Sequence, residues 1–149
     1  MTRPRQPGHH AAGRGRVLGL SFVFLWFFIG GILHFAATDT EARIVPPYIP
    51  WPVAAVLVSG VFELLGAAGL LLPRLRRTAG IGLFLLTLAV TPAHIYMLQE
   101  PALFPVPLWA LWLRLPIQAA LLWLILWSTQ RPSTASVRQP AGFGLDIPK

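Results

Sequence analysis

Four long apolar runs constrain the fold of this chain more than any other feature of its sequence. They extend over about residues 17–37, 53–72, 78–98 and 108–127. Each run has about 20 residues, and a helix that rises about 1.5 Å per residue crosses roughly 30 Å of hydrocarbon with that length. The sequence therefore predicts an all-α integral membrane protein, built as a four-helix bundle with short loops.

Composition supports the same class and limits the chemistry. Of the 149 residues, 55% are hydrophobic and 11% are charged, which is more apolar than a soluble domain of this size requires. The chain has no cysteine, so a thiol nucleophile, a disulfide and thiolate metal ligands are excluded within it. Four spans leave no room for a separate catalytic domain, and no metal-ligand spacing is present. A stand-alone enzyme and a metal site are therefore not expected.

The charged residues alternate between the connections. Basic residues precede the first run, separate the second from the third, and follow the fourth, whereas the other two connections carry the acidic residues. The basic residues concerned are Arg3, Arg5, Arg14, Arg16, Arg74, Arg76, Arg77, Arg131, Arg138 and Lys149, and the acidic ones are Asp39, Glu41 and Glu100. Under the positive-inside rule, both termini are expected on the cytoplasmic side of the membrane. Because the basic residues flank apolar runs, the expected partner is the lipid bilayer and not nucleic acid.

The chain divides into three parts. Residues 1–15 are rich in Arg, Gly and Pro and predict a basic disordered arm, residues 16–128 form the membrane domain, and residues 129–149 predict a disordered tail. Within the membrane domain, the segment 46–52 has four prolines, which forbid a regular helix and predict a stiff, lid-like external cap. Glycines in the first three runs are expected to let helices pack closely.

Polar side chains within the apolar runs are the candidates for function, because burying them in a membrane is costly. They are His34, Glu63, His94, Arg114 and Gln118, with Ser59, Thr91 and Tyr96 as supporting positions. From the rise of a helix, all five lie between the outer surface and about the midplane. Ser59 and Thr91 share helix faces with the polar residues that follow them, and the two polar residues of the fourth run are four residues apart. The sequence predicts one shared polar pocket that opens outward.

Two readings stay open for these residues. Glu63 and Arg114 either form a structural ion pair that locks two helices or act in function. His34 and His94 either make capping bonds near the interface or bind a ligand. Axial haem ligation by the two histidines is disfavoured, since nothing in their local sequence is specific for haem. Pro92 is expected to loosen the third helix and Pro116 the fourth.

Several segments in this order resemble one known family. They are residues 44–52 (IVPPYIPWP), 58–66 (VSGVFELLG), 70–73 (LLLP), 92–97 (PAHIYM) and 114–118 (RLPIQ). Together they resemble the DoxX family of small bacterial membrane proteins over about residues 17–127. The resemblance implies a four-helix membrane bundle with recurring polar positions at the five residues named above. His94 stands where related sequences often carry asparagine, so a mechanism that needs histidine there does not extend across the family.

The resemblance also directs the functional hypotheses. The DoxX family takes its name from a subunit of a thiosulfate:quinone oxidoreductase, which implies a membrane subunit of a quinone-linked or stress-related oxidoreductase complex. A quinone is then a compatible cofactor, and a soluble redox protein on the cytoplasmic side a compatible partner. Two alternatives remain: a small transporter or channel component that works as a homo-oligomer, and a scaffold without chemistry. The sequence alone does not name the ligand.

Overall fold

The computed structural model describes residues 9–130, and every regular element in that range is helical. The elements are α1 (His9–Ala36), α2 (Thr38–Ala42), α3 (Pro52–Leu71), α4 (Arg76–Ala89), α5 (Thr91–Gln99), the short 3-10 helix η1 (Pro101–Leu103) and α6 (Leu108–Thr129). The all-α prediction is confirmed. Four segments are long and apolar enough to cross a membrane: Gly13–Ala36, Pro52–Leu71, Arg76–Gln99 and Leu108–Thr129.

The first helix begins earlier than the apolar run that predicts it. Its first residue is His9, so residues 9–15, expected to belong to a disordered arm, are helical. Ala11, Ala12 and Arg14 favour a helix, whereas the preceding Pro7 and Gly8 disfavour one. The rest of the predicted arm, residues 1–8, and the predicted tail from residue 131 onward lie outside the described residues.

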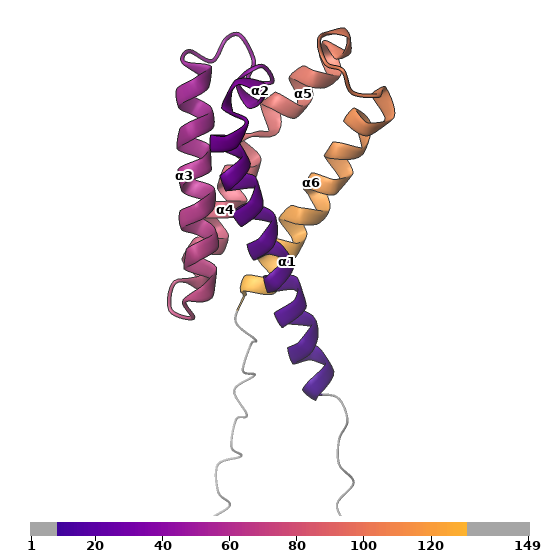
Figure 1. The fold of residues 1–149 in the computed structure, drawn as a ribbon. Helices are drawn as coiled ribbons and strands as arrows, with labels where there is room; N and C mark the ends of the chain where they lie inside the picture. The colour runs from indigo at the N-terminus through magenta and orange to yellow at the C-terminus, as the bar shows by residue number, and fades with distance from the viewer. Residues whose placement is uncertain (1–8, 131–149) are drawn as a thin grey trace, which may run out of the picture.

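The third apolar run forms two helices joined at Val90. The helix α4 ends at Ala89 and α5 begins at Thr91, with Pro92 in its first turn. Proline lacks an amide hydrogen and collides with the carbonyl group four residues earlier, which explains the break. The ribbon shows α5 leaving the direction of α4 at this point (Figure 1). Pro116, in contrast, lies within a helix that continues on both sides.

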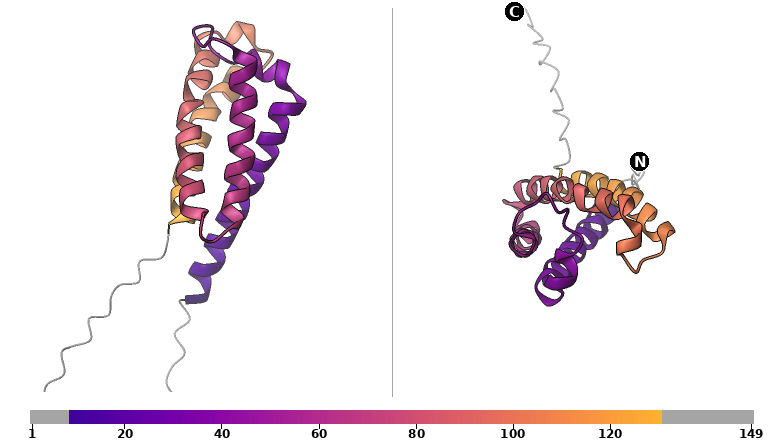
Figure 2. Two further views of the ribbon diagram at one scale, coloured as in Figure 1. Left: turned by 90° about the vertical axis from the view of Figure 1, so that its left-hand side faces the viewer. Right: turned by 90° about the horizontal axis from the view of Figure 1, so that it is seen from above.

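The long helices form a ring in which each packs against two others. α1 contacts α3 and α6, and α4 contacts the same two helices (Figures 1 and 2). The approach of α1 to α3 depends on glycine: a Cβ atom at Gly31 would lie 3.2 Å from the carbonyl oxygen of Gly60. Small residues at such crossings allow helix backbones to meet. Gly82 was expected to act in the same way, but a Cβ atom there would have no neighbour within 4 Å.

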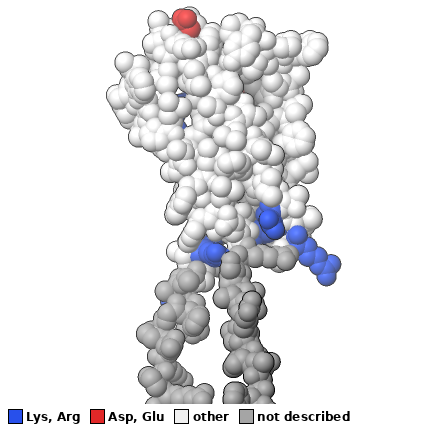
Figure 3. Space-filling view, turned by 180° about the vertical axis from the view of Figure 1, so that it is seen from behind, with Lys and Arg blue, Asp and Glu red and all other residues white. Residues whose placement is uncertain are grey.

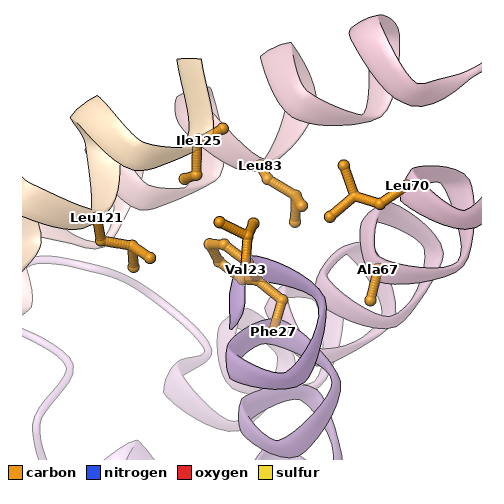
Figure 4. Close-up of a cluster of buried hydrophobic side chains, with 7 residues drawn as sticks. All are labelled: Val23, Phe27, Ala67, Leu70, Leu83, Leu121 and Ile125. Carbon is orange, nitrogen blue, oxygen red and sulfur yellow. The ribbon is translucent and has the colours of Figure 1, made fainter. Parts of the chain in front are cut away.

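Buried apolar side chains fill the half of the bundle where the described chain starts and finishes. Seven of them, from all four sides of the ring, point toward one another in Figure 4: Val23, Phe27, Ala67, Leu70, Leu83, Leu121 and Ile125. At the same end, Nη1 of Arg16 donates a hydrogen bond to the carbonyl oxygen of Gln130 at 3.0 Å. The beginning of α1 and the end of α6 therefore lie side by side.

The outer surface of the bundle is apolar along its length and charged at its ends. Large apolar side chains such as Leu18, Leu65 and Leu85 are exposed on three of the long helices. On the face shown in Figure 3, basic side chains gather at the end where the described chain starts and finishes, and acidic atoms lie at the opposite end. This distribution matches the alternation of charge that the sequence shows between its connections.

Candidate functional site

One cavity of about 470 Å³ lies between the helices on the acidic side of the apolar core. Residues of α1, α2, α3, α4, α5 and α6 line it, together with the segment that joins α2 to α3. Its volume is in the range of small-molecule sites, which are mostly apolar with a few placed polar groups. The structure brings all five predicted polar residues to this cavity: His34, Glu63, His94, Arg114 and Gln118. Ser59, a predicted supporting residue, also lines it.

Gln118 is the centre of a hydrogen-bond network between α4, α5 and α6. Its side-chain amide nitrogen donates to the carbonyl oxygen of Thr87 at 2.8 Å and to the hydroxyl oxygen of Thr91 at 2.6 Å. Its amide oxygen lies 2.5 Å from Nδ1 of His94. The residue is only 6% exposed, so these bonds satisfy a polar group that burial would otherwise make costly. They also connect the two helices that the break at Val90 separates.

The same network determines which nitrogen of His94 carries the proton. A backbone carbonyl can only accept, so the NH2 group of Gln118 must face Thr87 and its oxygen must face His94. The Nδ1 atom of His94 is therefore the donor, and in the neutral imidazole Nε2 is an acceptor. Because His94 lines the cavity and Nε2 makes no hydrogen bond to any described residue, this acceptor is available to a ligand.

Glu63 pairs with a histidine and not with Arg114. Its Oε1 atom lies 3.7 Å from Nε2 of His34, a contact that is an ion pair when His34 is protonated. A structural pair between Glu63 and Arg114, one of the two readings left open by the sequence, is not found among residues 9–130. Gly30 explains the geometry, because a Cβ atom there would lie 2.7 Å from Oε2 of Glu63. The missing side chain leaves room for the carboxylate against α1, one helical turn from His34.

Arg114 lines the cavity without a protein partner among the described residues. Its guanidinium makes no hydrogen bond and no ion pair there, although it can donate five hydrogen bonds. The second nitrogen of His34, Nδ1, is buried and also has no hydrogen-bond partner in that range. The site therefore offers an unused cation, an acceptor nitrogen on His94, and a carboxylate paired with histidine.

The segment 43–51, where the prolines predicted a cap, lines the cavity at its acidic end. Ile44, Val45, Pro46 and Ile49 line the cavity, and Pro46 is fully buried. Trp51 then adopts a left-handed conformation with φ of 57° and starts α3. Such a φ is rare outside glycine and turns the chain sharply.

Some residues of the site were missed, and others lie outside it. Glu41 of α2 and Trp26 of α1 line the cavity, but neither was predicted there. For Glu41, the only signal in the sequence was the acidic character of the connection between the first two apolar runs. Thr91 supports the site through Gln118. Tyr96 instead packs edge-on against Phe104, with ring centroids 6.0 Å apart, and does not line the cavity.

Comparisons with known proteins give one result about family. None of the curated proteins and none of the solved structures with which we compared the chain matches it. The DoxX resemblance was not tested by these comparisons and stays a prediction. The family model that matches, over residues 23–130, is described as a domain of unknown function, DUF8561. This range includes the end of α1, all later helices and every residue that lines the cavity. The chain belongs to the DUF8561 family.

Proposed function

We propose that the chain is a multi-pass protein of the bacterial plasma membrane with both termini in the cytoplasm. Four apolar helices support this proposal, as does the position of Arg16 and Gln130 beside each other at the basic end. Basic residues remain preferentially on the cytoplasmic side of bacterial membranes. The cavity then lies in the outer half of the bilayer.

Labelling of single cysteines tests this orientation. The chain has no cysteine, so Thr40→Cys and Thr78→Cys each introduce one thiol at an exposed position at opposite ends of the bundle. In intact spheroplasts, a membrane-impermeant maleimide should label the Thr40→Cys protein at once. The Thr78→Cys protein should react only after the membrane is permeabilised. The reverse pattern would contradict the orientation.

We further propose that the cavity binds the headgroup of a quinone, as part of an oxidoreductase complex. The observation that carries the proposal is the meeting of complementary groups in one largely apolar cavity. Arg114 can donate to a quinone carbonyl oxygen, and Nε2 of His94 can accept a hydrogen bond from the hydroxyl of the quinol. Glu63 and His34 form a pair that can take up or release a proton within the cavity.

The remaining parts of the complex are also proposals. Reduction of a quinone to a quinol takes two electrons and two protons, and a soluble redox protein would supply the electrons. The proposed partner would dock on the cytoplasmic side, where the basic residues gather. Likeness to the DoxX family agrees with this assignment, because the polar positions implied by that resemblance line one cavity. Copurification from native membranes in mild detergent tests the partner.

Quinone binding is tested with the purified protein in nanodiscs. Decyl-ubiquinone should quench the tryptophan fluorescence, since Trp26 lines the cavity. Hydrogen bonds to charged groups are worth about 1.5–3 kcal/mol, so Arg114→Gln should weaken binding about tenfold or more. Arg43→Gln is the matched control, because Arg43 is exposed and does not line the cavity. Absence of saturable binding, or an equal loss in both variants, would refute the proposal.

A second candidate function is transport of a small solute by a homo-oligomer. Glu41 and Glu63 both line the cavity, which is an arrangement that can bind a cation. Uptake into proteoliposomes that disappears with Glu63→Gln, together with an empty quinone site, would favour this candidate. A scaffold role would instead show as loss of partner recovery in step with loss of stability.

A further inference from the structure

Four apolar side chains line the cavity along α1 and α6. Phe27 of α1 and Leu121 of α6 line the cavity where it meets the apolar core, and both belong to that core. Trp26 and Ile117, on the same two helices, line the cavity as well but are 45% and 41% exposed. Two partly exposed side chains that line the cavity from neighbouring helices point to an opening between them.

The packing of α1 and α6 explains the opening. The contacts between these helices lie toward the basic end, where a Cβ atom at Gly19 would lie 2.9 Å from the ring of Trp127 and where Arg16 binds Gln130. Toward the acidic end, α1 packs on α3, and α6 packs on α5. The two helices cross and then diverge, as the ribbon shows (Figure 1).

The opening lies at hydrocarbon depth. Trp26 is ten residues from the outer end of α1 at Ala36, and Ile117 is nine residues from the outer end of α6 at Leu108. At about 1.5 Å per residue, both are roughly 14 Å from the outer ends of their helices. Toward the outer end, the segment 43–51 lines the cavity with apolar side chains, among them the fully buried Pro46. A ligand that entered from water would have to pass these side chains.

We propose that the ligand enters from the membrane through this lateral opening, and that it is an amphiphile with an uncharged headgroup and an apolar tail. The headgroup occupies the cavity beside Arg114 and His94, and the tail stays between Trp26 and Ile117 in contact with lipid. Among the charged residues that line the cavity, Glu41 and Glu63 oppose one Arg114. An anionic phospholipid headgroup is therefore disfavoured. This inference rests on the proposed quinone site and specifies how that site is reached.

A comparison of two ligands with one obstructed opening tests the inference. The probes are decyl-ubiquinone and its tail-less analogue with the same ring, measured in nanodiscs of one lipid composition. Ile117→Trp adds bulk at the opening, and Ile95→Trp is the control, because Ile95 is 44% exposed but does not line the cavity. Overpacking should weaken binding of decyl-ubiquinone about tenfold in Ile117→Trp. The tail-less analogue should bind within about twofold of the native affinity in both variants.

The outcomes separate the lateral opening from the site itself. Suppose that the tail-less analogue binds the native protein, and that Ile117→Trp changes the affinity for both ligands to the same extent or not at all. The lateral opening is then refuted, while the headgroup site stands. If neither ligand binds the native protein, the proposed function fails and the inference fails with it. Trp26→Ala provides a second variant that enlarges the opening without adding bulk. Because this variant lacks the fluorescent Trp26, association is followed with radiolabelled decyl-ubiquinone. It should be severalfold faster than in the native protein, and an unchanged rate would also count against the opening.

Discussion

Replacing Gln118 with methionine tests whether one buried amide holds α4, α5 and α6 together. Methionine is unbranched and close in volume, so Gln118→Met removes the polar atoms without creating a large cavity. The change deletes three hydrogen bonds: one from His94, one to the carbonyl oxygen of Thr87 and one to the hydroxyl of Thr91. Thr91 keeps its own bond to the carbonyl oxygen of Thr87, at 3.3 Å.

The expected cost follows from measured bonds of the same kind. Side-chain hydrogen bonds between membrane helices average about 0.6 kcal/mol, with a maximum near 1.7 kcal/mol. Three bonds of average strength contribute about 2 kcal/mol to the free energy of unfolding. We expect Gln118→Met to lower that free energy by about this amount, measured by unfolding in mixtures of dodecyl maltoside and sodium dodecyl sulfate. Gln99→Met is the control, since Gln99 is exposed and makes no side-chain hydrogen bond within residues 9–130.

Two results would refute the reasoning. The first is a Gln118→Met protein whose unfolding free energy lies within about 0.5 kcal/mol of the Gln99→Met protein, the range expected for surface substitutions. The second concerns location. If the network spans the helix break, its loss should speed amide hydrogen exchange around Val90. A stability loss with unchanged exchange there would assign the cost to another part of the bundle.

Two further predictions concern helix packing and the ion pair. Gly60→Ala should lower the free energy of unfolding by about 1–3 kcal/mol, because its Cβ atom would lie 2.8 Å from that of His34. Gly82→Ala is the control: its Cβ atom would lie in open space, so the change should be neutral or stabilising by up to about 1 kcal/mol. Equal effects of the two substitutions would contradict the role of the glycine contact. Glu63→Gln should cost about 1 kcal/mol or less in the same unfolding assay, because its carboxylate lies 3.7 Å from His34. It should also abolish quinone reduction by the proposed complex. A loss of several kcal/mol would instead assign Glu63 a structural role.

Most of the helix positions follow from the sequence because apolar length alone determines them. The expected second run, residues 53–72, corresponds to α3 at Pro52–Leu71, and the fourth, residues 108–127, to α6 at Leu108–Thr129. Only the lengths and ends of apolar runs are needed for this step. The break at Val90 was signalled by Pro92, but Pro116 carried the same signal and did not interrupt its helix. A proline therefore indicates where a helix can break, and neighbouring packing decides whether it does.

The cavity could be predicted as a group of residues but not as a set of contacts. Helical spacing is enough to put Ser59 and Glu63 on one face, and depth is enough to bring polar groups of different helices to one level. The partner of Glu63 depends instead on how α1 rotates against α3, which Gly30 and Gly31 determine through close backbone contact. The contribution of Glu41 depends on the path of the α2–α3 connection, and periodicity carries no information about that path.

Gly30 makes the position of the Glu63 carboxylate depend on a residue that has no side chain of its own. Even alanine at position 30 would place a Cβ atom 2.7 Å from Oε2 of Glu63, so the carboxylate would have to turn away from α1. The shape of the cavity and the position of the Glu63 carboxylate in it would then change, although every polar residue stays the same. A substitution at position 30 would therefore reshape the cavity, although ordinary inspection would assign that position to helix packing alone.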